Sequence, residues 1–247
     1  MPRLDQALVE RGLCESREKA KRAIMAGLVK INRHSARKPS DAVRPDDRIE
    51  LEAGDKYVGR GGHKLEHALI HFQLKVEGSV AVDLGASTGG FADCLLQHGA
   101  KKVFAVDVGH GQLAWKLRRD PRVSVMDRTN ARDLTPARFP QPFQPADLAV
   151  IDCSFISLTK ILPAAAGLLR NGGKLVALIK PQFEAGKAEA DKGAGVITDP
   201  RIHQRVLREL EAFVAGLGRL RWLAVTPSPL LGPAGNQEFL ALLEKID

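Results

Sequence analysis

The sequence is poor in cysteine and lacks long apolar runs, and each shortage excludes a class of protein. Its 247 residues include three cysteines, Cys14, Cys94 and Cys153. This odd number at wide spacings predicts no disulfide framework or zinc site, so we expect reduced, buried thiols. No apolar run approaches the roughly 18 residues that a membrane-spanning helix requires. The N-terminal segment contains an acidic residue, Asp5, and no apolar core. We therefore expect neither a membrane segment nor a secretory signal.

Aromatic residues are also scarce, whereas positive charge is abundant and concentrated near the N-terminus. Aromatic residues make up 5% of the chain, and Tyr57 is the first of them. The net charge is +8, and residues 1–40 contain ten basic and four acidic side chains. This asymmetry favours a polyanionic partner, although a run of charge alone more often marks a solvated helix face. Because the segment has no aromatic ring for base stacking, we expect it to recognise folded RNA by shape and phosphate position.

Residues 1–55 are predicted to form a small α+β domain. Apolar residues recur at helical spacing before Gly12, and Ser16 is a candidate N-cap for a second helix that stops at Gly27. Short strands are expected at residues 28–31, 43 and 49–51.

This segment resembles the small RNA-binding domain named after the fourth ribosomal protein of the small subunit. The matching residues are Arg3-Leu4-Asp5, Leu8, Gly12, Ser16-Arg17, Ala20, Ile24, Gly27, Val29, Asn32, Pro39, Val43 and Asp47. In that domain two helices present basic side chains to RNA. The resemblance therefore implies these RNA-binding residues: Arg3, Arg17, Lys19, Lys21 and Arg22.

Residues 56–62 are polar and glycine-rich, and we interpret them as a linker. A phosphate cradle is the alternative, but no strand precedes the glycines, so a flexible hinge is favoured.

Residues 63–247 alternate between predicted strands and helices, which indicates an α/β domain with a mostly parallel sheet and helices on both faces. Asp199-Pro200 begins the last helix with a cap residue and a proline in the first turn. The last two strands are expected to form a hairpin. The seven predicted strands are residues 80–84, 102–106, 123–125, 148–151, 175–179, 220–225 and 239–243. The predicted helices are residues 91–98, 113–119, 158–169 and 201–217.

A glycine-rich turn between two acidic residues indicates a nucleotide-type ligand. Asp83 ends the first of these strands, glycines follow, and Asp107 ends the next strand. Ser87 stands where a dinucleotide fingerprint has its second glycine, which weakens an NAD interpretation. An acid before the turn suits a cationic amino-acid portion, and an acid after the next strand suits ribose hydroxyls. The pattern resembles the S-adenosylmethionine site of class I, Rossmann-like methyltransferases.

The cofactor-binding residues expected from this pattern come from four strand ends. Asn130 can flank the adenine or can belong to a plain turn, and these two interpretations remain equal. The full set is Asp83, Gly85, Ser87, Thr88, Gly89, Gly90, Phe91, Asp107, Asn130 and Asp152.

Four segments carry a second resemblance. They are Arg60-Gly61-Gly62-His63-Lys64-Leu65, Ile151-Asp152-Cys153-Ser154-Phe155, Lys180-Pro181-Gln182-Phe183-Glu184 and Gly235-Asn236-Gln237-Glu238-Phe239. Their pattern of Lys, Asp, Lys and Glu resembles that of FtsJ-like ribose 2′-O-methyltransferases. With the N-terminal domain, the whole chain resembles the TlyA family of rRNA methyltransferases, some of which are called hemolysins. The resemblance implies a catalytic tetrad of Lys64, Asp152, Lys180 and Glu238.

The chemistry of ribose methylation explains such a set. A ribose hydroxyl is a weak nucleophile and must lose its proton as the methyl group transfers. Lysine accepts a proton only in its neutral form, which burial and a neighbouring cation favour. Lys64 can be that neighbour for Lys180, while Asp152 and Glu238 are expected to orient the lysines and the ribose.

Two other features do not predict chemistry. Cys153 follows an apolar strand without an obvious base, so a packing thiol is favoured over a nucleophile. The segment around it also lacks the prolines that base-methylating enzymes often carry there. His63, His67 and His71 recur at intervals of four, but no metal-binding pattern surrounds them, so no metal is expected.

Residues 184–198 are polar and glycine-rich, and we expect a mobile loop that brings Lys187 and Lys192 near RNA phosphates. A disordered insertion without a role is the alternative.

These observations predict a cytoplasmic, S-adenosylmethionine-dependent 2′-O-methyltransferase that acts on a flipped nucleotide of rRNA, in ribosomal subunits or their precursors. The family resemblance implies a cytidine target. One alternative is a membrane-lytic protein, which needs an amphipathic or spanning segment that the sequence lacks. The other is an RNA-binding protein without catalysis.

Overall fold

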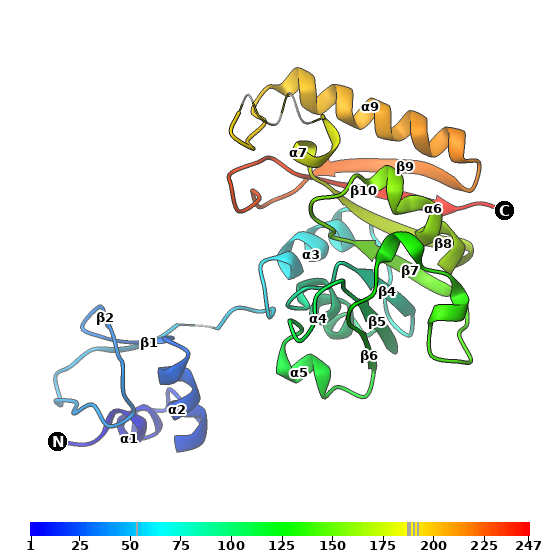
Figure 1. Ribbon diagram of the computed structural model, residues 1–247. Coiled ribbons are helices and arrows are strands. Elements are labelled where there is room, and N and C mark those ends of the chain that lie inside the picture. Colours follow the sequence, from blue (N-terminus) through cyan, green and yellow to red (C-terminus); the bar gives the residue numbers. More distant parts are fainter. Residues whose placement is uncertain (53, 187–188, 190, 192) are drawn as a thin grey trace. The chain divides into compact units, whose positions relative to one another are not determined.

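The chain folds into two compact units, which are described separately. The computed structural model describes residues 1–52, 54–186, 189, 191 and 193–247. One unit comprises Met1–Lys56 and the other Tyr57–Asp247 (Figure 1). The segment expected to be a linker, residues 56–62, therefore falls mostly within the second unit. The reason is the Tyr57 ring, which is buried so close to Gly62 that a Cβ added there would collide with it.

The N-terminal unit pairs two helices with a three-stranded antiparallel sheet in the order β2-β1-β3. Ser16 caps the second helix as predicted, because its Oγ accepts the backbone N–H of Lys19 at 3.3 Å. Val43 is buried in the core but forms no strand, and β2 was not predicted. The elements are α1 (Leu4–Glu10), α2 (Arg17–Met25), β1 (Val29–Ile31), β2 (His34–Ser35) and β3 (Ile49–Leu51).

The second unit is built on a seven-stranded sheet in the order β6-β5-β4-β7-β8-β10-β9. Its strands are β4 (Val80–Leu84), β5 (Lys102–Val106), β6 (Val123–Met126), β7 (Ala146–Ile151), β8 (Leu169–Ile179), β9 (Leu220–Pro227) and β10 (Phe239–Lys245). Strands β4 to β8 pair in parallel, whereas β10 runs antiparallel to β8 and β9. The predicted fold class and C-terminal hairpin are therefore confirmed.

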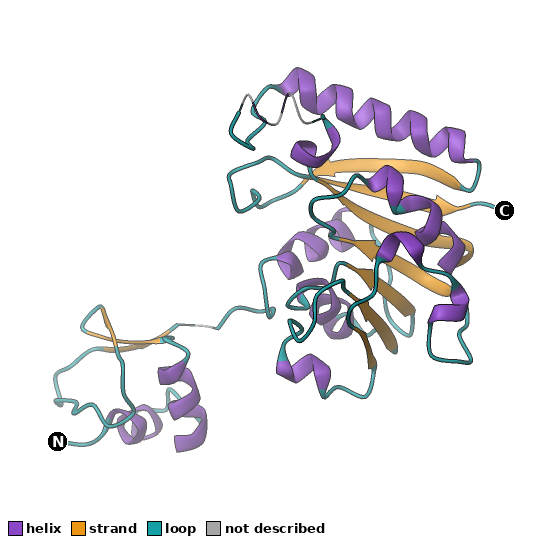
Figure 2. Cartoon of the chain, in the orientation of Figure 1, coloured by secondary structure: helices purple, strands orange, loops and turns teal. Residues whose placement is uncertain are grey.

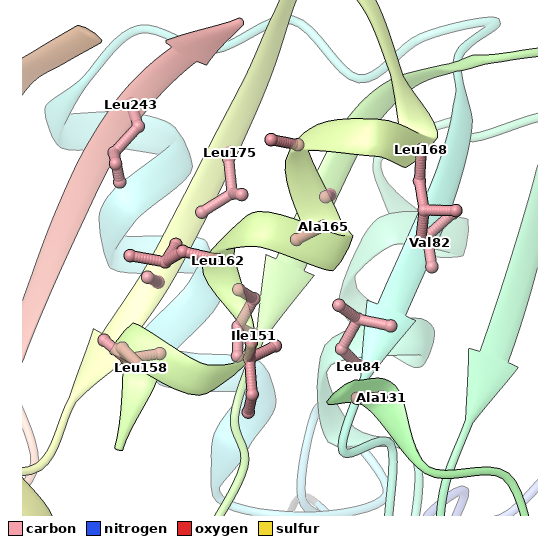
Figure 3. Close-up of a cluster of buried hydrophobic side chains, with 14 of the residues drawn as sticks. Val82, Leu84, Ala131, Ile151, Leu158, Leu162, Ala165, Leu168, Leu175 and Leu243 are labelled. Carbon is pink, nitrogen blue, oxygen red and sulfur yellow. The ribbon is translucent and has the colours of Figure 1, made fainter. Parts of the chain in front are cut away.

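Helices cover both faces of this sheet, and a separate apolar core lies on each face (Figure 2). One core joins the sheet to α6 and α9, through residues such as Leu162 and Leu210; Figure 3 shows the part of it beneath α6. The other core joins the sheet to α3 and α4, through Leu65 and Leu95. The helices are α3 (Gly61–His71), α4 (Gly90–Gln97), α5 (Trp115–Arg118), α6 (Leu162–Leu168), α7 (Pro181–Glu184) and α9 (Pro200–Leu217).

The largest differences from the predicted bounds are in three elements. The helix expected over residues 158–169 is divided into the 3-10 turn η3 (Leu158–Lys160) and α6, with Pro163 in the first turn of α6. Strand β8 begins at Leu169 rather than at residue 175. Helix α5 is a single turn, shorter than the predicted 113–119.

The strand order fixes where a ligand can bind. Strands β4 and β7 are neighbours in the sheet, but the chain continues from β4 to β5 on one side and from β7 to β8 on the other. The connections that follow β4 and β7 therefore lead in opposite directions along the sheet. In open α/β sheets, ligands bind at such a switch point, outside the carboxyl ends of the strands. The predicted glycine turn follows β4, and Asp152 follows β7.

Candidate active site

A cavity of about 570 Å³ opens at the carboxyl ends of β4, β7 and β8. It brings together all four residues of the expected tetrad, although they come from distant parts of the chain. Its lining residues are Arg60, Gly61, Lys64, Gly85, Ala86, Ser87, Thr88, Gly90, Phe91, Asp152, Ser154, Phe155, Lys180, Gln182, Phe183, Gly195, Pro233, Ala234, Asn236 and Glu238.

Lys64 and Glu238 form one buried ion pair in the wall of this cavity. Lys64 lies in the first turn of α3, and Glu238 directly precedes β10. The two side chains are hydrogen-bonded, with 2.5 Å between Lys64 Nζ and Glu238 Oε2. Only 1% of the Glu238 side chain is exposed. A carboxylate is costly to bury without a partner, so Lys64 and Glu238 hold each other in place.

Lys180 forms the second pair with Asp152. Lys180 directly follows β8 and Asp152 directly follows β7, and these neighbouring parallel strands end at the same edge of the sheet. Lys180 Nζ lies 2.6 Å from Asp152 Oδ1 and donates to Ser154 Oγ at 2.8 Å. The Lys180 side chain is 10% exposed. Because each lysine has its own carboxylate, the tetrad contains two neutralised pairs rather than two adjacent free cations.

The glycine turn after β4 needs glycine for two different reasons. Gly85 has φ +86°, and an added Cβ would lie 2.8 Å from the carbonyl oxygen of Asp152. Gly89 has φ +97°, and its missing side chain leaves room for Leu117, whose Cδ1 would collide with a Cβ. Gly89 therefore allows the turn to pack against Leu117, and it does not line the cavity. Gly85, Ser87, Thr88, Gly90 and Phe91 line the cavity as expected.

Asp107 ties this turn to the end of β5. Its two carboxylate oxygens accept the backbone N–H groups of Ser87 at 2.8 Å and Gly109 at 2.7 Å. Ser87 has φ +48°, a backbone conformation that residues other than glycine rarely adopt. Each carboxylate oxygen can accept a second hydrogen bond, so Asp107 remains able to bind a ribose hydroxyl. Val108, the next residue, presents an exposed apolar side chain at the same strand end.

Asp83 lies beneath the turn and does not reach the cavity. It is fully buried, and neither carboxylate oxygen has a hydrogen-bond partner among the described residues. Burial raises the pKa of Asp83 well above its usual value, and the nearby carboxylates of Asp152 and Asp107 raise it further. Asp83 does not line the cavity, so the expected direct contact between its carboxyl group and the amino group of the cofactor is not available in this structure.

These features fit the expected S-adenosylmethionine. The glycine turn offers a cradle that a side chain at Gly85 would fill, and Asp107 stands at the ribose position expected for this fold. A cation bound near the buried carboxyl of Asp83 would favour its ionised form. Asn130 is the weakest member of the set, because its Oδ1 accepts the N–H of Arg132 and caps the 3-10 turn η1 (Ala131–Asp133). Its amide group remains exposed.

The structure also contains two aromatic residues that the sequence did not single out. The rings of Phe155 and Phe183 line the cavity with their centroids 5.1 Å apart. Phe155 is 91% exposed and has φ +63°. A bulky residue in that backbone region is strained, and such strain occurs at functional sites. Phe155 belongs to a quoted motif, but nothing in the letters indicates its exposure.

Glu184 connects α7, which contains Phe183, to the segment that follows Phe155. Its carboxylate accepts the hydroxyl of Ser157 at 2.6 Å and the backbone N–H of Leu158 at 2.8 Å. Burial raises the pKa of Glu184, although these two hydrogen bonds oppose the shift. Lys187 and Lys192, predicted to approach RNA phosphates from the following loop, lie outside the described residues.

Cys153 has the features of a packing thiol. Its Sγ lies 3.4 Å from the carbonyl oxygen of Leu84. Burial, together with Asp152 and Asp83, raises its pKa to about 12, so the reactive thiolate is scarce near neutral pH.

The expected RNA-binding residues of the N-terminal unit differ in their surroundings. Arg3 and Arg17 both donate to the buried Asp5, at 3.1 and 3.0 Å. Burial alone would raise the pKa of Asp5, but the two guanidinium groups hold it below its usual value. Asp5 therefore fixes where these two arginines lie, while about half of each arginine side chain stays exposed.

The other three candidates lie on α2. Lys19 pairs with Glu15 and Lys21 with Glu18, on the exposed surface. Surface pairs of this kind contribute little and are easily exchanged for another anion. Arg22 is exposed and has no ion pair in the described part of the chain.

Comparison with known proteins identifies both units. Residues 57–245 match FtsJ-like methyltransferases, and residues 2–49 match the S4 domain. The 16S/23S rRNA (cytidine-2′-O)-methyltransferase TlyA of Mycobacterium tuberculosis is 44% identical over 245 residues, covering 98% of this chain and 89% of the relative. Hemolysin A of Brachyspira hyodysenteriae is 42% identical over 239 residues, covering 97% and 98%. A solved structure from Streptococcus thermophilus, whose description names a hemolysin, is 46% identical with a TM-score of 0.75 and covers 100% of this chain and 89% of that one.

Within the described ranges, every helix is too short or too polar to cross a membrane. The methyl donor of FtsJ-like methyltransferases is S-adenosylmethionine, in agreement with the glycine turn and its two acids. Because the FtsJ-like match covers most of the chain and the relatives match nearly its full length, the chain belongs to the TlyA family of FtsJ-like methyltransferases, with an N-terminal S4 domain.

Proposed function

We propose that this chain transfers a methyl group from S-adenosylmethionine to a ribose 2′-hydroxyl of ribosomal RNA. The observation that carries the proposal is the convergence of two lysine–carboxylate pairs on one cavity beside the glycine turn. The name of the mycobacterial relative indicates cytidine in 16S and 23S rRNA, and we extend that target to this chain. The reaction takes place on ribosomal subunits or their precursors, in the cytoplasm.

Lys180 is the proposed base. S-adenosylmethionine supplies an electrophilic methyl group on a positively charged sulfur. In its neutral form, the Nζ of Lys180 could accept the proton of the 2′-hydroxyl, so that the oxygen could attack the methyl group that S-adenosylmethionine would supply. Asp152 Oδ1 and Ser154 Oγ then hold the new ammonium group, at the 2.6 and 2.8 Å seen in the structure.

Lys64 is proposed to stabilise and orient the ribose oxygen. Its ammonium group is fixed at the cavity wall by the nearly inaccessible Glu238. A cation that is already held in place can stabilise negative charge on the oxygen without reorganising during the reaction. We infer that Glu238 and Asp152 position the two lysines, and the two ion pairs support this role. Arg60, which also lines the cavity and donates to the carbonyl oxygen of Leu231, can neutralise a neighbouring phosphate.

Phe155 and Phe183 are proposed to hold the base of the target nucleotide. The 2′-hydroxyl of a stacked, helical nucleotide cannot reach the tetrad, so the nucleotide must turn out of its helix. An exposed ring that lines the same cavity offers the released base a stacking surface. Stacking does not select one base, so this pair positions the nucleotide and leaves the choice of cytidine to other contacts.

The N-terminal unit is proposed to bind folded rRNA through Arg3, Arg17 and α2. Asp5 holds the two arginines at fixed positions, and the lysines of α2 can exchange their surface carboxylates for phosphates. Lys187 and Lys192 remain predicted phosphate contacts.

The test is a methyl-transfer reaction with a chemical readout of the product. Purified chain is incubated with labelled S-adenosylmethionine and with ribosomal subunits from a strain that lacks the gene, and the RNA is digested to nucleosides. The proposal predicts label in 2′-O-methylcytidine. Label in a methylated base, or no label in either subunit, would contradict it.

A further inference from the structure

A tryptophan on α5 is exposed beside the cavity and belongs to neither apolar core. Trp115 is 71% exposed, whereas Leu113 and Leu117 on either side of it are buried. The guanidinium carbon of Arg119 lies 5.6 Å from the centroid of the Trp115 ring. Arg119 has no carboxylate partner in the ranges that the structure describes. A single exposed apolar residue is ordinary in itself, so its surroundings decide what it can do.

The position of α5 is fixed by the glycine turn. The backbone N–H of Ala114 donates to the carbonyl oxygen of Thr88 at 3.0 Å, and Thr88 lines the cavity. Leu113 and Leu117 fill the space left by the missing side chain of Gly89. Trp115 therefore follows directly after a residue that is hydrogen-bonded to the cavity wall.

The charge of this segment is complementary to RNA. Between Leu113 and Val123 the chain has four basic residues and one acid, Asp120. The other three basic residues are satisfied by carboxylates: Lys116 by Asp93, Arg118 by Asp127 and Arg122 by Asp120. Arg119 alone among them has an aromatic ring as its described partner, so its charge is available to a phosphate.

We propose that Trp115 and Arg119 form a stacking site for an unpaired base of the RNA substrate, outside the catalytic cavity. The inference rests on the proposed function, because it takes RNA as the substrate. Every nucleobase can stack on an indole ring, and an arginine beside the ring adds a contact to the neighbouring phosphate. The site binds a nucleotide near the target and keeps the target ribose at the tetrad. The N-terminal segment, which has no aromatic residue, cannot provide this kind of contact.

Tryptophan fluorescence tests the site directly, because the chain has two tryptophans, Trp115 and Trp222. Trp222→Phe leaves Trp115 as the reporter, and Trp115→Phe leaves Trp222 as the matched control on β9. The full-length chain is titrated with an unstructured oligoribonucleotide of about twelve nucleotides, within the usual size of a single-strand site. Quenching is expected in Trp222→Phe and not in Trp115→Phe. In binding measured by anisotropy, Trp115→Ala should lose about tenfold in affinity and Trp115→Phe less.

Three results would overturn the inference while leaving the proposed function intact. The first is RNA binding without quenching of Trp115. The second is quenching by S-adenosylhomocysteine alone, which would assign Trp115 to the cofactor site. The third is protection of Trp115 from iodide before RNA is added, which would mean that protein covers it. Failure of the unaltered chain to bind or methylate any RNA would instead overturn the proposed function, and this inference with it.

Discussion

At the scale of single residues, the buried carboxyl group of Asp83 should make the free energy of unfolding depend on pH. Its carboxyl group is fully buried and has Asp152 and Asp107 nearby, so its pKa in the folded protein lies well above 3.8, its usual value. The folded chain therefore holds a proton that the unfolded chain releases. Stability contributed by the protonated form is fully present below pH 3.8 and decreases as the pH rises toward the folded pKa.

Asp83→Asn should accordingly make the free protein more stable at neutral and alkaline pH. The amide cannot ionise, so the variant escapes this loss, and we expect a gain of about 1 to 3 kcal/mol near pH 8 that shrinks toward pH 4. Urea unfolding of both proteins across this pH range measures the gain. A gain that stays constant with pH would exclude the buried charge as its cause. S-adenosylmethionine should bind the variant more weakly, because a bound cation favours an ionised carboxylate at position 83, which the amide cannot form.

The tetrad was predictable residue by residue, whereas its pairing was not. Lys180 and Asp152 follow apolar strands, and the carboxyl ends of parallel strands meet at one edge, so their proximity follows from the sequence pattern. Which carboxylate contacts which lysine depends on loop conformations that the pattern does not contain. For the same reason the exposure of the Phe155 ring could not be predicted, since it depends on a left-handed backbone conformation at that residue. Arg3 and Arg17 were predicted to contact RNA, but their hold on Asp5 could not be foreseen.

At the scale of elements, the glycine turn is the part of the fold on which the cofactor site depends most. Gly85→Ala should abolish S-adenosylmethionine binding and lower the free energy of unfolding by about 2 kcal/mol or more. The added methyl group would be strained at φ +86° and would lie 2.8 Å from the carbonyl oxygen of Asp152. Isothermal titration calorimetry and urea unfolding measure the two effects.

Gly78→Ala is the matched control for this substitution. Gly78 has φ +70°, but no atom lies within 4 Å of the position that a Cβ would take there. It should show the backbone strain of about 1 to 2 kcal/mol without loss of cofactor binding. Equal effects of the two substitutions on binding would show that the close approach to Asp152 does not matter.

Most strands of the second unit were predictable because buried strands are short apolar runs between polar turns. Strands β4 and β5 have the predicted bounds, and β7 and β9 are each two residues longer than predicted. The start of β8 was missed, because Arg170 to Gly173 are polar and glycine-rich and are typical of a loop. The two residues of β2 have no apolar signal at all. Elements that are stabilised by pairing with another strand or by a neighbour's side chain have the weakest apolar pattern in the sequence.

At the scale of the whole molecule, the account assigns phosphate recognition largely to the S4 domain and methyl transfer to the FtsJ-like unit. Residues 1–40 contain ten basic and four acidic side chains, and five of the residues expected to contact RNA lie in the S4 domain. RNA affinity should therefore fall steeply with salt, with a slope that reports the number of phosphates contacted. Arg22→Ala should lower the affinity and make the slope shallower by about one unit. A salt-independent affinity in filter binding would contradict phosphate recognition by this unit.

The central claim is that Lys180 takes the proton of the ribose hydroxyl, and single-turnover methyl transfer by Lys180→Ala tests it most directly. Lys174→Ala is the matched control, because it also removes a paired lysine from β8, at a position in the middle of the strand that does not line the cavity. We expect Lys180→Ala to slow methyl transfer by about 10² to 10⁴-fold, with binding of S-adenosylmethionine and RNA unchanged, and Lys174→Ala to react at the normal rate. Transfer by Lys180→Ala at an undiminished rate would contradict the account.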